Sequence, residues 1–301
     1  MNNIFSITVT YNPNLDILLK QIAQVMSQFV NVIIVDNNSL NFNELQKSIK
    51  TLHFENVKII KNQSNLGLAK AQNIGINLAI NNFASHVALF DQDSVPDDLF
   101  FKQLTEDEDF LKKKNIEISC IGPTIYSPEN FSAYPFLKYF GPFIINCYQN
   151  IVPAPQEAAF IISSGSLINV KVLLDVGFMN EDFFIDYIDV EWCFRAKNKG
   201  FGCYISTQAK MSHCVGDNRR RFLWRTISEH SELRRYYLVR NFICIINLNY
   251  IPKSYKIREA ILNFARLSFS LVMKSQKTKQ IKYTFKAFQD AYNGNYGKLK
   301  E

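Results

Sequence analysis

Two carboxylates one residue apart are the side chains best placed to do chemistry. Asp91 and Asp93 come directly after the apolar run Val87 to Phe90. In an extended chain such residues point the same way, so both carboxylates would face one ligand. Mg²⁺ or Mn²⁺ needs only one or two protein carboxylates when a substrate phosphate completes its shell. The pair predicts a metal that stabilises a departing diphosphate. The alternative is an acidic turn before a helix opened by Pro96 and Asp97.

A second group of carboxylates lies near residue 190. On a helix, Asp186 and Asp189 would share a face at a spacing of three, as would Asp182 and Asp186 at a spacing of four. Crowded carboxylates raise one another's pKa, so one can act as a general base near neutral pH. The alternative is an acidic helix N-terminus that complements the macrodipole. Interleaved aromatic residues favour a site that excludes water or stacks on a sugar: Phe183, Phe184 and Trp192.

Apolar strands and amphipathic helices alternate through the first hundred residues. We expect strands at 5–9, 32–35, 57–60 and 86–90, and helices at 16–29, 42–52 and 69–80. This alternation predicts an α/β protein with a mostly parallel sheet and covering helices. Ligands of such sheets bind at the carboxyl ends of the strands. Polar side chains gather at those ends and predict a nucleotide pocket: Thr10, Asp36, Asn37, Asn38, Asp91 and Asp93.

Two of these strand-end segments allow two interpretations each. Asp36 could accept hydrogen bonds from a uracil or thymine ring or from ribose, or it could begin an ordinary turn. Gly67 could bring the backbone close to a ligand, or it could follow a helix cap formed by Asn65. Neither a Gly-x-Gly-x-x-Gly sequence nor a Walker A sequence is present, so the dinucleotide-binding and P-loop classes are disfavoured.

Composition indicates a globular protein of one large domain or two small ones. The chain has 301 residues, of which 47% are hydrophobic and 25 are Phe, so it can build a substantial core. Its six Cys are scattered without a Cys-x-x-Cys pair, which favours reduced thiols over a disulfide framework or a zinc site. Neither a signal peptide nor a transmembrane run is recognisable, so we expect a cytoplasmic protein.

The net charge of +7 is unevenly distributed. From Lys197 onward there are 21 Lys and Arg against 6 Asp and Glu, whereas the preceding part has 13 against 21. The basic C-terminal part predicts an anionic partner, either nucleic acid or a membrane face, unless it is simply a solvated helical surface. Nucleic acid is the less favoured partner, because no helix-turn-helix, zinc-finger or RNA-binding signature is visible.

The C-terminal part is expected to be mostly helical. Helices are predicted at 229–246 and 257–273, the second with an apolar stripe, and Lys274 to Lys286 adds basic charge. A basic amphipathic helix can lie on a membrane surface or form a dimer contact, and the sequence leaves both open. A basic loop at 217–225, with Arg219 to Arg221, could close over a diphosphate or touch an acidic acceptor.

The ordered motifs resemble those of inverting family-two glycosyltransferases, which have the GT-A fold. The resemblance covers about the first two-thirds of the chain, and its motifs lie at 9–12, 35–39, 65–75, 90–94, 163–166 and 177–195. The run Asp186 to Cys193 and the tail Ala287 to Lys298 are similar to the rhamnosyltransferase branch. This implies transfer of rhamnose from dTDP-L-rhamnose in the synthesis of bacterial surface polysaccharides such as O-antigen or capsule.

The resemblance also implies roles for individual residues. Asp91, Asp93 and His213 would bind the divalent metal, and Asp36 would read the nucleobase. Asp189 matches the catalytic base, but Ile188 stands where most relatives have Glu, so Asp186 and Glu191 remain alternatives. The donor would contact Thr10, Tyr11, Asn12, Asp36, Asn38, Asn65, Gly67, Lys70, Asp91, Gln92 and Asp93. The acceptor would contact Ser164, Gly165, Trp192 and Arg195.

These implications define an expected domain plan. Residues 1–215 would form the nucleotide-sugar-binding and catalytic domain, and residues 216–301 a basic, mostly helical region for acceptor, membrane-surface or dimer contacts. The acceptor would be a glycan or a lipid-linked oligosaccharide, which would place the protein at the inner face of the cell membrane. The alternative donors are UDP-galactose, UDP-galactofuranose or UDP-glucose. Nucleotidyl transfer is a different class, disfavoured because no basic glycine-rich phosphate loop is present near the N-terminus.

Overall fold

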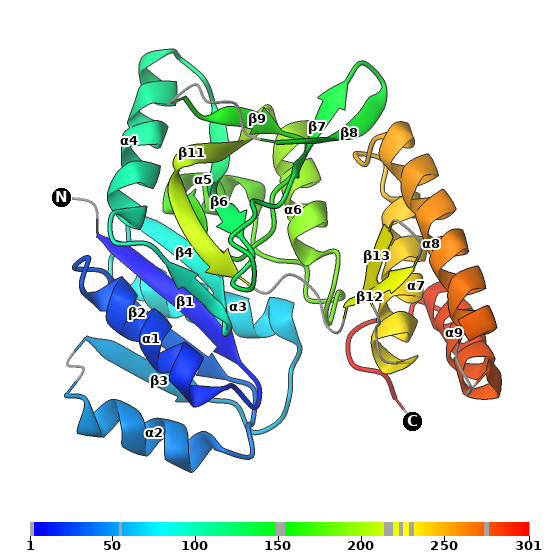
Figure 1. Ribbon diagram of the computed structural model, residues 1–301, viewed down its shortest axis with the longest axis horizontal. Coiled ribbons are helices and arrows are strands. Elements are labelled where there is room, and N and C mark those ends of the chain that lie inside the picture. Colours follow the sequence, from blue (N-terminus) through cyan, green and yellow to red (C-terminus); the bar gives the residue numbers. More distant parts are fainter. Residues whose placement is uncertain are drawn as a thin grey trace.

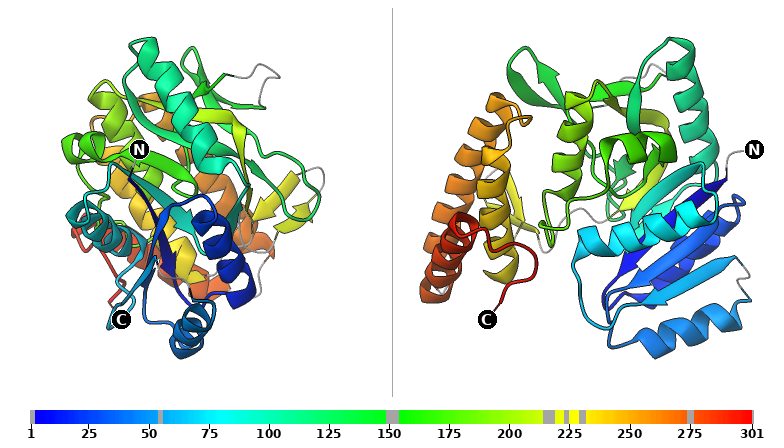
Figure 2. Two further views of the ribbon diagram at one scale, coloured as in Figure 1. Left: turned by 90° about the vertical axis from the view of Figure 1, so that its left-hand side faces the viewer. Right: turned by 180° about the vertical axis from the view of Figure 1, so that it is seen from behind.

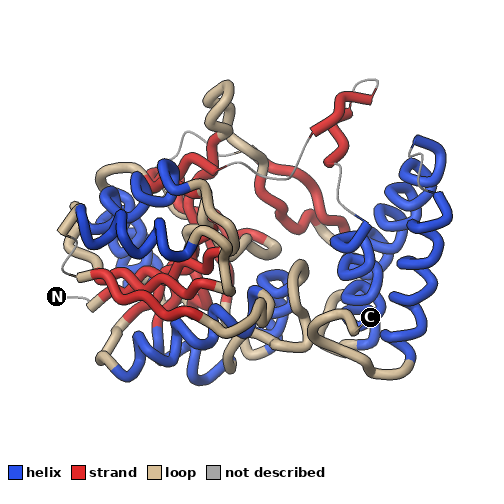
Figure 3. The backbone as a smooth tube through the Cα atoms, turned by 90° about the horizontal axis from the view of Figure 1, so that it is seen from below, coloured by secondary structure: helices blue, strands red, loops and turns tan. Residues whose placement is uncertain are grey.

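A mixed sheet lies at the centre of the molecule, and helices cover both of its faces (Figures 1 and 3). The computed structural model describes residues 3–53, 56–148, 154–213, 219–222, 225–228, 232–273 and 277–300. The sheet runs in the order β3-β2-β1-β4-β10-β6-β11-β5. Its first four strands are parallel and confirm the expected strands: β1 (Ile4–Thr10), β2 (Asn31–Asp36), β3 (Val57–Lys61) and β4 (His86–Asp91).

Helices cover opposite faces of these strands. Helices α1 (Leu15–Met26), α2 (Phe42–Thr51) and α3 (Leu68–Asn81) confirm the three predicted helices, and α4 (Phe100–Lys113) follows them. Helix α1 begins where the Asn14 side chain accepts hydrogen bonds from two backbone N–H groups, and it buries Leu18 and Ile22 in one core cluster. Helix α3 packs against the other face, where a Cβ on Gly75 would lie 2.4 Å from the Ile7 side chain. The close fit requires glycine.

The chain after Asp93 forms a strand, so the prediction that Pro96 and Asp97 open a helix is wrong. Ser94–Pro96 is the short strand β5, which pairs antiparallel with β11 (Gly202–His213), and α4 begins only at Phe100. The pairing places Ser94 opposite His213, at the end of β11. The pairing of β5 with the distant strand β11 therefore decides the local structure, and no local sequence pattern predicts this pairing.

The remaining strands and two helices complete the sheet and its surroundings. They are β6 (Ile118–Tyr126), β7 (Phe136–Phe140), β8 (Phe143–Cys147), β9 (Gln156–Ala158), β10 (Ser166–Asn169), α5 (Val170–Val176) and α6 (Ile188–Asn198). Three buried cysteines meet where β6, α6 and β11 pack together: Cys120, Cys193 and Cys203. All five cysteines in the described residues are free thiols, and Cys214 lies outside them.

The C-terminal part forms a hairpin and a group of helices at the side of the molecule away from α1 and α2 (Figures 1 and 2). These elements are β12 (Arg219–Phe222), β13 (Arg225–Ser228), α7 (Glu232–Asn247), α8 (Lys253–Met273) and α9 (Lys277–Tyr292). The described part of the predicted basic loop at 217–225 is thus a hairpin, and its other residues lie outside the described ranges. Among the helices in those ranges, none is long and apolar enough to cross a membrane.

Candidate active site

A cavity of about 640 Å³ opens at the carboxyl ends of β1 and β4, as expected for a sheet of this kind. It contains most of the predicted metal and catalytic side chains, together with residues from α7 and from the segment before α6. Its polar and aromatic lining includes Tyr11, Asn65, Asp91, Gln92, Asp93, Phe184, Asp186, Asp189, His213 and Arg234. A larger hollow of about 840 Å³ lies beside α1, but Asp93 is its only predicted site residue. We therefore place the site in the first cavity.

Two carboxylates and an imidazole meet on one side of the cavity. His213 Nδ1 lies 3.2 Å from Asp93 Oδ1, and His213 Nε2 lies 3.6 Å from Asp91 Oδ2. One ligand atom from each residue lies within 4.8 Å of the other two. The imidazole is buried, whereas the two carboxylates are 38% and 40% exposed and so face the cavity. This donor set fits a divalent cation that keeps open positions for phosphate oxygens.

The electrostatics of this group also favour a cation. Burial raises the pKa of Asp91, and the neighbouring Asp93 raises it further, although His213 opposes the shift. Burial alone would lower the pKa of His213, but the two carboxylates outweigh it and raise that pKa above its ordinary value. Two anions held this close repel each other unless a positive charge lies between them. A divalent ion would provide that charge.

Buried side chains hold the loop that carries the two carboxylates. Gln21 on α1 donates from Nε2 to the carbonyl oxygens of Asp91 (2.7 Å) and Ser94 (2.5 Å). Ser164 Oγ accepts from the Asp91 backbone N–H at 3.0 Å and contacts Ser94 Oγ at 2.6 Å. Ser164, expected at the acceptor, thus supports the loop that carries Asp91 and Asp93. No role for Gln21 was predicted from the sequence, although a glutamine among the buried apolar positions of α1 indicates a buried hydrogen-bonding role.

Glycine is required at position 165, next to Ser164, for the backbone to support the same loop. Its φ is +79°, its N–H donates to the Leu89 carbonyl at 2.7 Å, and a Cβ would lie 2.8 Å from Pro123. Gln92 joins the loop that carries Asp91 and Asp93 to the end of β1, because its side chain accepts from the Tyr11 N–H at 2.8 Å and donates to the Tyr11 carbonyl at 3.3 Å. Both residues fix the backbone around the cavity.

Asp36 lies in a buried network at the ends of β1 and β2. Its carboxylate accepts from Thr10 Oγ1 at 3.0 Å, from the Ser39 N–H at 2.9 Å and from the Ser39 hydroxyl. Ser39 Oγ in turn accepts from the Asn12 N–H at 2.8 Å. The network fixes the two loops, and Asp36 does not line the cavity. Its role as the nucleobase reader stays a prediction, as do those of Thr10, Asn12 and the exposed Asn38.

Gly67 lets the acidic segment dock onto the start of α3. Its φ is +87°, and a Cβ would lie 2.6 Å from both the ring and the carbonyl oxygen of Phe184. The Leu68 N–H donates to that carbonyl at 2.7 Å. Lys70, expected at the donor, instead lies outside the cavity, where its Nζ is 3.6 Å from Glu181. Gly67 and Asn65 do line the cavity.

The acidic segment before α6 is not a helix, so the expectation that Asp182, Asp186 and Asp189 share one helical face is wrong. Helix α6 begins at Ile188, and both Asp186 (φ +65°) and Tyr187 (φ +64°) have left-handed backbone. Such a pair of non-glycine residues needs outside support. Asn241 on α7 provides it, because its Nδ2 donates to the carbonyl oxygens of Ile185 (2.7 Å) and Asp186 (3.2 Å).

Asp189 and Asp186 both line the cavity, but they have different neighbours. Asp189 lies in the first turn of α6, where burial raises its pKa to about 6 and hydrogen bonds from the Val190 and Ser163 N–H groups oppose the rise. Asp186 is instead paired with Arg234 of α7, whose Nη2 lies 3.0 Å away. Asp189 is thus the carboxylate whose pKa suits a general base near neutral pH. Arg234 was missed as a site residue, since only the fold brings α7 to the cavity.

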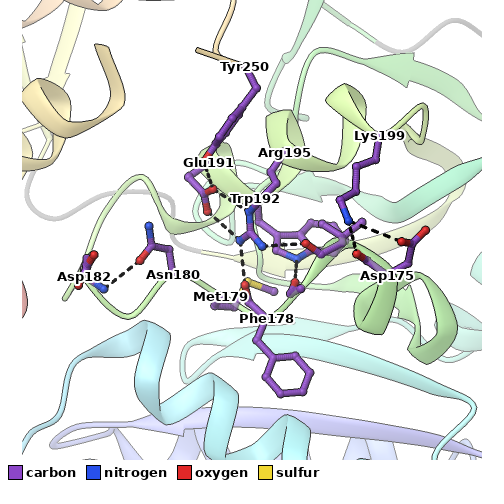
Figure 4. Close-up of polar contacts among 12 residues, drawn as sticks. Asp175, Phe178, Met179, Asn180, Asp182, Glu191, Trp192, Arg195, Lys199 and Tyr250 are labelled. Carbon is purple, nitrogen blue, oxygen red and sulfur yellow. Dashed lines mark hydrogen bonds and ion pairs between the residues drawn. The ribbon is translucent and has the colours of Figure 1, made fainter. Parts of the chain in front are cut away.

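Three other candidates lie in a buried network away from the cavity (Figure 4). Glu191 is 1% exposed and accepts from Arg195 Nε at 2.8 Å and from the Tyr250 hydroxyl at 2.5 Å. Arg195 also donates to the carbonyl oxygens of Val176 and Phe178. Trp192 donates from Nε1 to the Gly177 carbonyl at 2.8 Å. We assign this group to the packing of α6 against the chain that follows α5.

Replacing Glu191 with glutamine should destabilise the protein without acting on the chemistry. The change removes the negative charge of buried Glu191 that pairs with Arg195, whose side chain is 22% exposed and keeps its hydrogen bonds to two backbone carbonyls. Breaking a buried ion pair typically costs about 3–5 kcal/mol, so we expect a loss no larger than this. Urea unfolding should show this loss, while the folded variant keeps its nucleotide affinity. Glu106→Gln is the control, because its exposed pair with Lys102 contributes at most about 1 kcal/mol. A Glu191→Gln variant of normal stability that is catalytically inactive would return Glu191 to the catalytic candidates.

Comparison with known proteins defines the class. The model of glycosyl transferase family 2 matches residues 6–177, so the chain belongs to this family and is a glycosyltransferase. The chain is 33% identical to the dTDP-rhamnosyl transferase RfbF of Shigella flexneri over 287 residues, which cover 92% of this chain and 90% of that protein. The predicted family is thereby confirmed, and a rhamnosyltransferase is among its relatives.

Solved structures confirm the GT-A fold. The mannosyltransferase PcManGT from Pyrobaculum calidifontis, in complex with GDP-Man and Mn²⁺, matches with a TM-score of 0.57 and 13% identity, over 96% of this chain and 87% of that one. GalNAc-T7 with UDP, GalNAc and Mn²⁺ matches with a TM-score of 0.60 and 12% identity, over 92% of this chain. The match spans only 58% of the GalNAc-T7 chain. At these identities the comparison establishes the fold alone.

Proposed function

We propose that this glycosyltransferase moves L-rhamnose from dTDP-L-rhamnose to a hydroxyl group of a glycan acceptor. The observation that carries the donor assignment is the 33% identity, over 92% of the chain, to a dTDP-rhamnosyl transferase. A cavity of about 640 Å³ that combines carboxylates, an imidazole and an arginine suits a nucleotide sugar.

In this proposal Asp91, Asp93 and His213 hold Mg²⁺ or Mn²⁺. The bound ion would neutralise charge on the departing diphosphate. Support comes from the convergence of the three ligand atoms within 4.8 Å and from the Mn²⁺ named with two structures of the same fold. Gln21 and Ser164 act through the backbone of the metal loop and are positioning residues.

Asp189 is the proposed general base. A bond forms between the acceptor oxygen and the anomeric carbon of rhamnose while the bond from that carbon to the diphosphate oxygen breaks. The acceptor proton passes to the Asp189 carboxylate, and dTDP leaves. A single displacement of this kind inverts the anomeric configuration. Support comes from the position of Asp189 on the cavity wall and from its raised pKa of about 6.

Arg234 is proposed to bind the donor phosphates and to hold Asp186 in place. Its guanidinium lines the cavity and lies close enough to the metal group to oppose, together with His213, the rise that burial causes in the pKa of Asp91. Arg234→Gln should weaken dTDP binding about tenfold, since a hydrogen bond to a charged group contributes about 1.5–3 kcal/mol. Calorimetry checks this, with Arg266→Gln on α8 as a control outside the cavity. Equal affinities of the two variants would remove Arg234 from the donor site.

The acceptor is proposed to be a lipid-linked oligosaccharide at the inner face of the cell membrane. Residues 1–215 would bind the donor, and residues 216–301 would supply Arg234 and contacts to the acceptor or to the membrane. The test is incubation with dTDP-L-[¹⁴C]rhamnose, a divalent metal and the lipid extract of cells that make the acceptor. We expect radioactive lipid and one dTDP released for each rhamnose transferred. A trapped covalent rhamnosyl-enzyme would overturn the single displacement.

A further inference from the structure

Helices α8 and α9 each present a stripe of large apolar side chains to solvent. On α8 the stripe is Ile257, Ile261 and Phe264, and on α9 it is Ile281, Phe285, Phe288 and Tyr292. Each of these side chains is more than half exposed. The spacings of three and four residues place each set on one face of its helix. We call the two sets the α8–α9 apolar stripes.

The stripes are not the core-facing sides of these helices. Tyr255 and Glu259 on α8, and Ala287 and Asp290 on α9, are already buried at other positions around each helix. Single exposed apolar residues are common on protein surfaces, but seven on two consecutive helices are not. The stripes are therefore available to bind a partner.

The charges around the stripes are almost entirely basic. Helices α8 and α9 contain eight basic residues: Lys253, Lys256, Arg258, Arg266, Lys277, Lys279, Lys282 and Lys286. The same stretch contains two acids, Glu259 and Asp290, and both are buried. Glu259 pairs with Arg258 at 2.6 Å, and Asp290 pairs with Lys286 at 3.1 Å. No exposed carboxylate therefore offsets the basic charge on the described part of these helices.

We infer that the α8–α9 apolar stripes lie on a membrane surface that contains anionic lipids. Apolar side chains flanked by Lys and Arg are typical of helices that lie in the interface between lipid and water. A second copy of the chain would instead bring two basic surfaces together, which like-charge repulsion opposes.

The inference deepens the proposed function and rests on it only for the lipid-linked acceptor. Helix α9 packs against α7, and α7 carries Arg234 to the cavity. The Tyr236 hydroxyl of α7 donates to Asp290 of α9 at 2.8 Å, which joins the two helices through a buried contact. The membrane-binding surface and the donor site thus belong to one packed group of helices.

Vesicle sedimentation of the full chain tests this inference. The protein should sediment with vesicles of phosphatidylglycerol and phosphatidylcholine, should stay in solution with phosphatidylcholine alone, and should be released by high salt. The variant Ile281→Ser, Phe285→Ser, Phe288→Ser should bind at least about tenfold more weakly, since each exposed apolar group contributes through its buried area. Phe83→Ser, Phe131→Ser is the control, because both phenylalanines are exposed elsewhere on the molecule.

A parallel measurement of dTDP-L-rhamnose binding separates the two proposals. The stripe variant should bind the donor as the wild type does, which also shows that it is folded. Vesicle binding without donor binding would support the membrane surface and defeat the proposed donor. Equal vesicle binding by the stripe variant and the wild type would overturn the inference, as would a wild-type dimer, measured by light scattering, that the stripe substitutions dissociate.

Discussion

Replacing Asp189 with asparagine should lower rhamnose transfer by at least about a hundredfold and leave the affinity for the donor nearly unchanged. A general base contributes roughly 10²–10⁴ to a rate, and an amide of the same shape cannot take up the acceptor proton. The donor contacts and the metal group do not involve the Asp189 carboxylate in this account. Transfer from radioactive dTDP-L-rhamnose measures the first effect, and calorimetry with dTDP measures the second.

Asp186→Asn is the matched comparison, because Asp186 lines the same cavity but pairs with Arg234. We expect its main effect on donor affinity, through a displaced guanidinium. If Asp186→Asn is inactive while Asp189→Asn still transfers rhamnose, the base is Asp186.

The pH dependence of the transfer rate should also distinguish a general base at Asp189 from a purely structural role. Burial raises its pKa to about 6, so the wild-type rate should fall as the pH drops through about 6 and the carboxylate takes up a proton.

The same shift in the pKa of Asp189 means that its ionised form is unfavourable in the folded state. Its contribution to stability is therefore lost as the pH rises from the unfolded pKa toward 6. At pH 8 the Asp189→Asn variant should unfold at the same temperature as the wild type or at a higher one.

Replacing Asp93 with alanine should produce the second large effect, a loss of donor affinity that appears only when metal is present. Loss of groups that hold or orient a metal ligand typically costs about 10–100-fold in affinity. With Mn²⁺, calorimetry should therefore show dTDP-L-rhamnose binding weakened by at least about tenfold. Without metal the variant and the wild type should differ little. Asp98→Ala removes an exposed carboxylate from the same segment and serves as control. Unchanged affinity of Asp93→Ala in Mn²⁺ would exclude Asp93 as a ligand.

The parallel half of the sheet could be predicted because its signals are local. Short apolar runs, helices with periodic apolar positions and polar residues at the strand ends sufficed to place Asp91 and Asp93 at the carboxyl edge of the sheet. His213 lies about 120 residues further on and joins them because β5 pairs with β11. Only the family resemblance pointed to it, since a single histidine carries no pattern of its own.

The other half of the site depends on contacts between distant segments, which one sequence does not reveal. The left-handed backbone at Asp186 and Tyr187 is supported by Asn241 of α7 and by Glu259 of α8, which accepts from the Tyr187 hydroxyl at 3.1 Å. Spacing alone made this segment look helical. Glu191 was an alternative base because the family resemblance left the assignment open at Ile188, and the sequence does not show that its contacts in space are Arg195 and Tyr250.

The most direct test of the account is calorimetric titration of the protein with dTDP-L-rhamnose, with and without Mn²⁺, alongside UDP-glucose and UDP-galactose. We expect dTDP-L-rhamnose to bind, Mn²⁺ to strengthen this binding, and the UDP-sugars to bind more weakly or not at all. Tighter binding of a UDP-sugar would contradict the assigned donor. Absence of binding by every nucleotide sugar, with and without metal, would contradict the assignment of the cavity itself.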